Sequence, residues 1–509
     1  MPRTDSPCMT HPPAVLSHPS GPDAAAPLGH DEVLRIIAGL MLAMLLGALD
    51  QTIVATALPT IGAAFGDFTN LSWVVTAYLI AATIATPLYG KLSDIHGRRV
   101  MLLISVAVFS LASVACALAP SLLILVLARG LQGLGGGGLI SLAQTIIADV
   151  VSPRDRVRYQ GYIAGVFAAS SIAGPVLGGL FAQHLHWSLI FWINLPLGLA
   201  AFIVTRRALK RLPRHERRHD MDIAGAALMA VASILLLLAL GWGGLRYPWT
   251  SPEILGLLAG TALFTGLFIW RMRRAAEPFL PLDLLTDQVV GRGIATSFMT
   301  VGSMVGLSIF VPLYFETVRG LSASQSGLAL IPLMGGVVCG ATLSARTMPR
   351  LTHYKRPALA GSLVATLTLA GLAGAAAALP LAVLGMLLTL VGIGIGMMLP
   401  VCTISIQNAV PPHRMGTATG VMTFFRQLGG ALVVAVLGAV LLAVLGRGSG
   451  LDAETLAHGA GTPALAAAFG LVFAAVAVVQ LAATALLWTL PERPLRGSVL
   501  VTGEAGSIG

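Results

Sequence analysis

Charge, lysine and cysteine are all scarce in this sequence of 509 residues. Only 10% of the residues are charged and 56% are hydrophobic, whereas a soluble globular domain has about 25% charged residues. No soluble fold of this length could keep so much apolar surface out of water, so the composition requires a lipid bilayer as solvent. We expect neither a metal site nor a disulfide, because no metal-ligand spacing links the four cysteines and three of them lie in apolar runs, where a free Cys behaves as a small hydrophobic residue. The four are Cys8, Cys116, Cys339 and Cys402.

Basic residues outnumber acidic ones, 31 to 21, for a net charge of +10. They stand in short clusters between apolar runs. That spacing indicates membrane topology and lipid head-group contact, and it excludes a continuous nucleic-acid-binding face. We therefore expect the lipid bilayer as a partner and no nucleic acid.

Fourteen apolar runs follow one another along the chain, each long enough to supply the roughly 20 residues of a spanning helix. None alternates with a period of two, so each run predicts a helix. The runs lie near 34–56, 71–89, 100–119, 121–148, 160–182, 188–205, 223–241, 252–270, 293–315, 325–345, 358–379, 381–406, 416–442 and 464–490.

An internal repeat divides these helices into two groups. A helix beginning near 34 precedes a basic loop at Gly90, and a helix beginning near 292 precedes a basic loop at Arg346 at almost the same spacing. Parallel repeats of this kind are typical of two-bundle secondary transporters. We predict an all-α membrane protein with two six-helix bundles and two inserted linker helices. The predicted segments are a disordered cytoplasmic tail at 1–33, an N-terminal bundle at 34–206, a basic linker with two helices at 207–291, a C-terminal bundle at 292–490 and a cytoplasmic tail at 491–509.

The basic residues also predict the orientation. With both termini in the cytoplasm, the basic loops at 90–99, 206–218 and 346–356 all fall inside, as the positive-inside rule requires. The abundance of Ala, Gly and Arg suggests a bacterial source. We therefore expect a multi-pass protein of the bacterial cytoplasmic (inner) membrane with both termini inside.

The loop between the second and third predicted helices reads GKLSDIHGRR. Asp94 can lie at a helix N-terminus, where backbone N–H groups favour an anion, and the flanking glycines permit packing and turning. The string resembles the signature loop of the major facilitator superfamily, which implies the major facilitator fold and a gating role; a plain topology anchor is the alternative. The implied gating residues are Gly90, Asp94, Gly97, Arg98, Arg99 and Asp149. The matching loop at 346–356 has no acid, so we expect the latch on one side only.

Asp50 lies within the first predicted span, in the string LDQTIVATALP. A carboxylate in a span costs roughly 2.5–3.5 kcal/mol on insertion scales and usually marks a pathway or a proton relay. Arg129 in the fourth span lies at a similar predicted depth, so the two can pair; a purely structural pair is the alternative. The segment resembles the first-helix motif of the fourteen-helix drug:proton antiporters of that superfamily, which implies that Asp50 and Arg129 couple protons.

The fourth span continues from Arg129 as RGLQGLGGGG. Its glycines fit G-x-G-x-x-G, but a nucleotide fingerprint needs a preceding strand and a βαβ unit, and here the string lies inside a membrane helix. The glycines instead permit close helix packing. The element that contains Gln132 resembles the superfamily's fourth-helix motif, which implies assistance in proton transfer. We expect no cofactor and no enzyme activity.

The fifth span contains the string GVFAASSIAGPVLGG, in which small residues form a smooth packing face and a proline interrupts the helix. Ordinary small-residue packing would suffice to explain it. The string nevertheless resembles the motif characteristic of the superfamily's antiporters, which implies export. The residues concerned are Gly174, Pro175, Gly178 and Gly179.

Two further strings, WINLPLG at 192–198 and FFRQLGG at 424–430, fit the same branch of the superfamily. Candidate cavity residues combine soft or aromatic side chains with a few polar ones, which suit varied lipophilic substrates. Glu316 stands where relatives commonly have Gln, and simple solvation near the outer face is its alternative. For Arg426, pairing across the bundles is the alternative. The candidates are Gln132, Phe298, Met299, Met304, Phe310, Glu316 and Arg426.

Together these features predict a proton-coupled antiporter that exports lipophilic drugs or toxic small molecules by alternating access. A dedicated single-metabolite exporter or a symporter on the same fold is the alternative. Protons and a lipophilic substrate are the expected partners, and we expect monovalent organic cations among the substrates. A periplasmic adaptor remains open, as do the proton stoichiometry and the oligomeric state.

Overall fold

The computed structural model describes residues 30–67, 70–211, 221–244, 246–275, 277–445 and 463–495. These residues are helical almost throughout. They contain no β-strand, only an isolated bridge between Gly243 and Tyr247. Fourteen helices in the described ranges are long and apolar enough to cross a membrane, as the sequence predicted.

The first six spans form an N-terminal bundle. Its helices are α1 (His30–Phe65), α2 (Trp73–His96), α3 (Arg98–Ala117), α4 (Leu122–Val150), α5 (Pro153–His184), α6 (Leu189–Trp192) and α7 (Asn194–Ala208), followed by the 3-10 turn η1 (Leu209–Arg211). Two linker helices come next, α8 (Ile223–Trp242) and α9 (Pro252–Arg274).

The last six spans form a C-terminal bundle, preceded by the short helix α10 (Leu282–Thr286). Its elements are α11 (Gln288–Thr317), α12 (Ala323–Leu328), α13 (Ile331–Thr347), η2 (Met348–Arg350), α14 (Arg356–Ala375), η3 (Ala376–Ala378), α15 (Leu381–Ala409), η4 (Pro412–Arg414), α16 (Met415–Leu445) and α18 (Pro463–Thr489).

Two of the predicted spans are broken into a short and a long helix. Pro196 in the first turn of α7 and Pro332 in the first turn of α13 lack the N–H that would bond to Trp192 and Leu328 four residues earlier. The chain therefore leaves the helix at these points and starts a new one. The first of these breaks positions a side chain of the candidate site.

The predicted tails fall mostly outside the described residues. Helix α1 already begins at His30, so the four residues 30–33 belong to a helix and not to the tail predicted at 1–33. Residues 1–29 of that tail, and residues 496–509 of the predicted C-terminal tail, lie outside the described ranges.

The two bundles pack their helices in the same way, which supports the internal repeat seen in the sequence. A Cβ at Gly137 of α4 would press against the carbonyl oxygen of Ala82 in α2. In the second bundle, a Cβ at Gly396 of α15 would press against the carbonyl oxygen of Val337 in α13. Glycine in both places lets two helix backbones come into direct contact.

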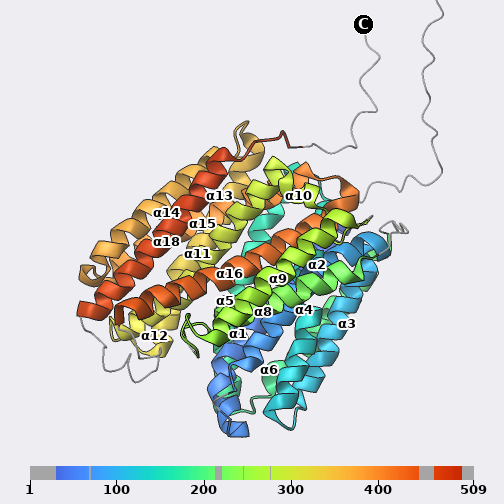
Figure 1. Cartoon of the computed structure of the whole chain (residues 1–509). Coiled ribbons are helices and arrows are strands. Elements are labelled where there is room, and N and C mark those ends of the chain that lie inside the picture. The colour runs from blue at the N-terminus through green and yellow to red at the C-terminus, as the bar shows by residue number, and fades with distance from the viewer. Residues whose placement is uncertain are drawn as a thin grey trace, which may run out of the picture.

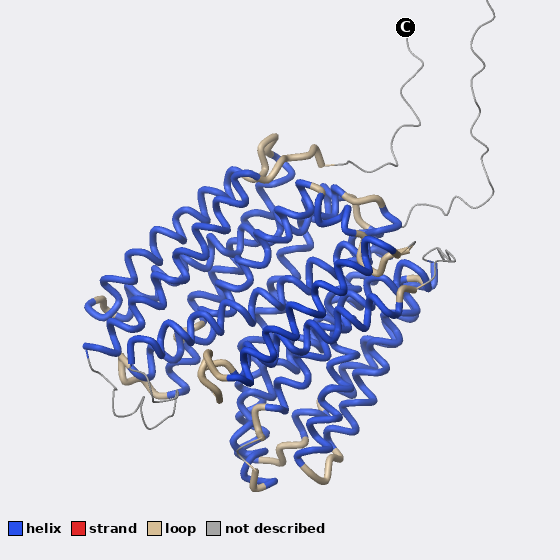
Figure 2. The backbone as a smooth tube through the Cα atoms, in the orientation of Figure 1, coloured by secondary structure: helices blue, strands red, loops and turns tan. Residues whose placement is uncertain are grey.

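The bundles lie side by side and approach each other most closely near the end where α1 begins and α18 ends, called here the end near the termini (Figure 1). They diverge toward the opposite end (Figure 2). Helices α2 and α16 form the main contact between them, and α5 contacts α13. The linker helix α8 packs against α2 and α16, whereas α9 contacts mainly α8 and leaves most of its side chains exposed.

Candidate functional site: a buried ion pair and an interbundle latch

Asp50 and Arg129 form an ion pair inside the N-terminal bundle. Arg129 Nη1 lies 2.6 Å from Asp50 Oδ2, and the two side chains are 1% and 0% exposed, respectively. Gln132, almost one turn after Arg129 on α4, donates to Asp50 Oδ1 at 2.9 Å and accepts from Arg129 at 2.6 Å. The sequence predicted a shared depth for the two charged residues, and the structure brings them into direct contact.

A third donor to Asp50 comes from the break between α6 and α7. Asn194 is the first residue of α7, and its Nδ2 lies 2.9 Å from Asp50 Oδ1 and 2.9 Å from the hydroxyl of Ser113 on α3. Both residues are fully buried. Three helices of one bundle, α1, α4 and α7, therefore meet at this carboxylate, which accepts from one guanidinium and two amides, and Ser113 of α3 accepts from both amides.

The Arg129 guanidinium has further partners besides Asp50. Its Nε donates to the carbonyl oxygen of Val74 at 3.1 Å, and its central carbon lies 4.3 Å from the centroid of the Tyr78 ring. Both residues lie on α2. Removing one partner of such a buried pair typically costs about 3–5 kcal/mol, because the other charge is left unpaired.

The glycines of the fifth span pack directly on α1 beside Asp50. Thr52 Oγ1 donates to the carbonyl oxygen of Ser170 on α5 at 2.9 Å. A Cβ at Gly174 would press against Thr52, and one at Gly178 would lie 2.5 Å from the carbonyl oxygen of Ile53. Within this bundle, α1 is therefore held between the Arg129 side of α4 and the small-residue face of α5.

Only half of the predicted small-residue motif takes part in this packing. Pro175 is exposed, and a Cβ at Gly179 would meet no atom within 4 Å. Gly174 and Gly178 are the two that the contact with α1 requires.

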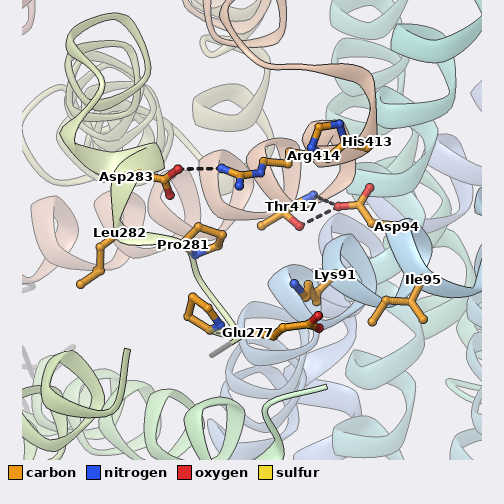
Figure 3. Close-up of a pocket in the computed structure, with 11 residues that line it drawn as sticks. Lys91, Asp94, Ile95, Glu277, Pro281, Leu282, Asp283, His413, Arg414 and Thr417 are labelled. Carbon is orange, nitrogen blue, oxygen red and sulfur yellow. Dashed lines mark hydrogen bonds and ion pairs between the residues drawn. The ribbon is translucent and has the colours of Figure 1, made fainter. Parts of the chain in front are cut away.

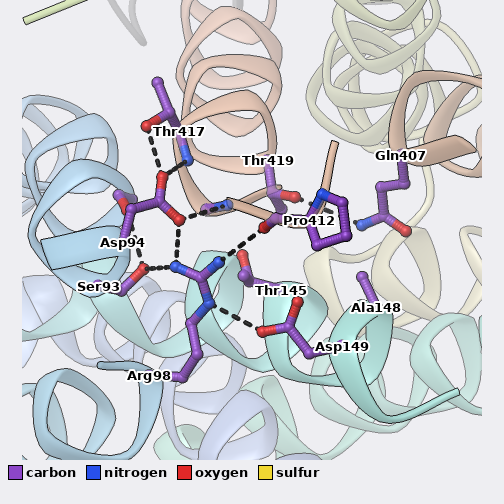
Figure 4. A network of polar contacts seen from close by, with 12 residues as sticks. Ser93, Asp94, Arg98, Thr145, Ala148, Asp149, Gln407, Pro412, Thr417 and Thr419 are labelled. Carbon is purple, nitrogen blue, oxygen red and sulfur yellow. Dashed lines mark hydrogen bonds and ion pairs between the residues drawn. The ribbon is translucent and has the colours of Figure 1, made fainter. Parts of the chain in front are cut away.

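Asp94, Arg98 and Asp149 form a cluster at the end of the bundle near the termini (Figure 4). Arg98 pairs with Asp94 through Nη1 and with Asp149 through Nε, the latter at 2.9 Å. Gly97, with a φ of 90°, makes the turn between α2 and α3 that places Arg98 beside Asp94. The sequence predicted that these charged residues act together, and the structure shows them in contact.

Asp94 also reaches the other bundle, where it binds the first turn of α16. Its carboxylate accepts hydrogen bonds from the backbone nitrogens of Gly416 and Thr417, at 3.1 and 2.8 Å, and from the Thr417 hydroxyl at 2.6 Å. The N–H groups of a first turn have no partner within their own helix and carry a partial positive charge, so they favour an anion. The acid at a helix N-terminus that the sequence predicted thus acts across the bundle interface.

The other two gating candidates differ in their contacts. Gly90 lies against the other bundle, since a Cβ there would be 2.5 Å from the carbonyl oxygen of Gly416. Arg99 donates instead to the carbonyl oxygen of Arg206, at 3.3 Å, within its own bundle.

Every hydrogen bond between described residues of the two bundles lies in the half of the molecule near the termini. Arg98 and Arg154 donate to the carbonyl oxygens of Pro412 and Pro349, and buried Arg156 donates to Gln407 at 3.0 Å. The deepest of these bonds runs from Gln427 on α16 to Thr86 on α2, at 3.4 Å. In the described state the two bundles are therefore closed against each other at the end where α1 begins and α18 ends.

A pocket of about 320 Å³ lies beside Asp94 at this end (Figure 3). The end of α2, the segment between α9 and α11, and η4 with the first turn of α16 form its walls, and Arg414 pairs with Asp283 there at 2.6 Å. Both signs of charge line it. Its lining residues are Lys91, Asp94, Ile95, Glu277, Pro278, Pro281, Leu282, Asp283, His413, Arg414 and Thr417.

The candidate cavity residues on α11 fall into different environments. Phe310 is 4% exposed and belongs to the core of the C-terminal bundle, and Met304 packs against that core. Met299 packs against a second core cluster, whereas Phe298 is half-buried. Glu316 is exposed at the end of α11.

Arg426 lies within α16 and donates from Nη2 to Thr403 at 2.7 Å and to Ser297 at 3.4 Å. Its Nε is buried without a hydrogen-bond partner. No described residue places a carboxylate within ion-pair distance of it. A charged side chain at the centre of a bilayer costs roughly 2.5–3.5 kcal/mol on insertion scales.

Several residues that complete these sites had no role predicted from the sequence. Asn194 and Ser113 on the Asp50 side, and Gly416 and Thr417 on the Asp94 side, were not singled out. Asn194 could have been noticed, because a polar asparagine inside an apolar span often marks a functional site. No feature of the sequence indicates the contact of Asp94 with Gly416 and Thr417, because it depends on how two distant helices dock.

Residues 40–434 match the family described as the Major Facilitator Superfamily. Multidrug transporter protein MdtP of Bacillus subtilis is 33% identical over 81% of this chain and 76% of its own length. Multidrug resistance protein 3 of the same organism is 31% identical over 80% and 79%. An uncharacterized MFS-type transporter of Mycobacterium tuberculosis is 36% identical over 86% of this chain, which spans 64% of that protein's length.

Solved structures share the fold at low identity. The proton:xylose symporter XylE superposes with a TM-score of 0.61 at 16% identity, covering 91% of this chain and 97% of that one. A bacterial homologue of the iron transporter ferroportin gives 0.59 at 14% identity, covering 91% and 99%. The chain belongs to the Major Facilitator Superfamily. It is a multi-pass membrane protein, with fourteen helices in the described ranges that are long and apolar enough to cross a bilayer.

Proposed function

We propose that this chain is a proton-driven antiporter that exports lipophilic small molecules across a bacterial cytoplasmic membrane, with both termini in the cytoplasm. The names of its relatives, which include multidrug transporters and efflux pumps of B. subtilis and of fungi, support export of such compounds. The basic loops at the terminal end support the orientation.

The observation that carries proton coupling is the ion pair between Asp50 and Arg129. Apart from Glu316 near the end of its helix, Asp50 is the one acidic residue in the interior of the fourteen spans. Protonation would remove the charge that Arg129 neutralises, while Arg129 would keep its bonds to Val74 and Gln132. Loading and release of one proton would thus alter how tightly α1 is held on α4.

The coupling step requires a change in the packing of α1. Asp50 is 0% exposed in the described state, so water reaches it only after the surrounding helices move. Thr52 and the glycines of α5 hold the other side of α1, so a shift of α1 would pass to α5 and to its contact with α13. Because α5 contacts the other bundle, such a shift would couple proton binding to rocking of the bundles, the motion by which transporters of this kind alternate access.

The latch at Asp94 would stabilise the state that is closed on the cytoplasmic side. An inside-negative membrane potential supplies about 2.3 kcal/mol per 100 mV for each proton that enters. That energy sustains a substrate gradient of about fifty-fold. The energy from one proton also exceeds the roughly 0.3–2 kcal/mol that an anion at a helix N-terminus contributes. Proton entry can therefore offset the contact that Asp94 makes.

Everted membrane vesicles test the proposal. In wild-type vesicles an imposed pH gradient should drive accumulation of a lipophilic fluorescent dye, and Asp50→Asn should abolish it. Arg246→Gln, which changes an exposed basic residue outside both sites, is the matched control and should transport normally. Equal accumulation with and without the gradient in wild-type vesicles would contradict the antiporter proposal.

A further inference from the structure

Arg426 carries a charge that the C-terminal bundle does not neutralise. Glu316 is the sole acidic residue in the six spans of that bundle. Ser297, which touches the Arg426 guanidinium, lies on the same helix about 28 Å from Glu316 at 1.5 Å per residue. No acid of these described spans can therefore reach Arg426.

The acids of the N-terminal bundle are engaged elsewhere. Asp50 is enclosed by Arg129, Gln132 and Asn194. Asp94 binds Thr417, which lies about 14 Å before Arg426 along α16. The neutral hydroxyls of Ser297 and Thr403 are thus the hydrogen-bond partners of a guanidinium whose Nε has none.

Arg426 also stands where the two bundles meet. The next residue, Gln427, makes the deepest hydrogen bond between the bundles, to Thr86 on α2. Phe424 and Phe298, both half-buried, lie on the same two helices as Arg426 and Ser297. A guanidinium with a spare donor, on a helix that forms the bundle interface and with aromatic residues on the same two helices, suits an acid with an apolar body. A guanidinium also binds planar carboxylates in a two-point geometry that a lysine cannot reproduce.

We infer that Arg426 is the substrate-anchoring residue and that the exported compounds are lipophilic carboxylic acids, bound as anions. This inference rests on the proposed transport function and names its substrate class. It replaces the expectation of organic cations, whose attraction depended on Asp50 and Glu316. Asp50 has no exposed surface for a cation, and Glu316 is at the far end of α11.

Binding to the purified full-length protein tests the inference. Pyrenebutyric acid and its neutral primary amide have the same apolar body and differ in charge. Wild-type protein should bind the acid at least tenfold more tightly than the amide. Arg426→Gln should remove this preference by weakening the acid alone, whereas Arg426→Lys should retain part of it because the charge remains without the planar fork.

Arg246→Gln is the matched control. It removes one positive charge from an exposed outer loop and should leave both affinities unchanged. Equal binding of acid and amide by the wild-type protein would overturn the inference, and so would equal weakening of both ligands by Arg426→Gln. The wild-type comparison decides even if a variant fails to fold.

Failure of the substrate inference can be distinguished from failure of the antiporter proposal. If the acid and the amide bind equally while a pH gradient still drives dye export, the substrate inference fails and the antiporter proposal stands. If the acid binds selectively but no gradient drives export of any compound, the antiporter proposal fails and the anchoring role of Arg426 stands.

Discussion

The carboxylate of Asp94 lies 2.8 Å from the backbone nitrogen of Thr417, although the two residues belong to different bundles. This contact exists only while the end of α2 and the start of α16 are together. When the bundles separate at that end, the first turn of α16 loses its anion. The contact therefore biases the equilibrium between the two states of the transporter without touching the buried ion pair.

We predict that Asp94→Asn slows turnover and leaves substrate affinity nearly unchanged. An anion at a helix N-terminus contributes about 0.3–2 kcal/mol, so its loss should shift the population of the closed state by about 2- to 30-fold. Turnover and half-saturation are measured in vesicles. Arg99→Gln should behave as wild type, since Arg99 bonds within its own bundle. A large fall in affinity at normal turnover would rule out a latch.

We predict that Asp50→Asn abolishes proton-driven export and also lowers thermal stability. The variant leaves Arg129 buried and unpaired, at a cost of about 3–5 kcal/mol. The double variant Asp50→Asn/Arg129→Gln removes both charges and should recover much of the stability but none of the coupling. Melting in detergent and vesicle transport separate the two effects. Export that stays proton-driven in the double variant would place the coupling group elsewhere.

We predict that Gly178→Ala impairs folding and transport, whereas Gly179→Ala does not. The added methyl group at 178 would lie 2.5 Å from the carbonyl oxygen of Ile53, and a backbone atom cannot move aside easily. Overpacking of this kind costs about 1–3 kcal/mol. At 179 the methyl group would meet no atom within 4 Å. Thermal melting of the two purified variants is the measurement, and equal melting temperatures would show that α1 and α5 adapt.

We predict that Arg246→Cys is labelled from outside intact cells and Arg350→Cys only after permeabilisation. The two positions lie at opposite ends of the bundles and both are exposed. A membrane-impermeant thiol reagent, applied to a background without the native cysteines, gives the readout. The reverse pattern would place the termini outside and the positive-inside prediction would be wrong.

Most of the fold could be predicted from the sequence because spanning helices depend on local composition. A helix in lipid must satisfy its own backbone, so a run of about 20 apolar residues such as the one around Leu388 is sufficient evidence for a span. Helix ends were less accurate. Helix α1 begins at His30, earlier than predicted, because polar residues can extend a helix beyond the bilayer.

The candidate site was predictable in its charged members and not in its neutral ones. Asp50 and Arg129 stand out because ionised groups are rare in spans. Asn194 donates a hydrogen bond to Asp50 because the helix breaks before Pro196, and this break turns the Asn194 amide toward the carboxylate. No pattern in the sequence predicts that two side chains on different helices come within hydrogen-bonding distance.

The sequence by itself determined that this is a membrane protein of fourteen helices with a repeat, and it singled out Asp50, Arg129 and Asp94. These are consequences of composition, which acts on each segment separately. The tertiary structure alone decided which groups those residues meet. It set Asp94 on the first turn of α16 and left Arg426 without an acid among the described residues, because the docking of one bundle on the other is the sum of many weak contacts that no single segment encodes.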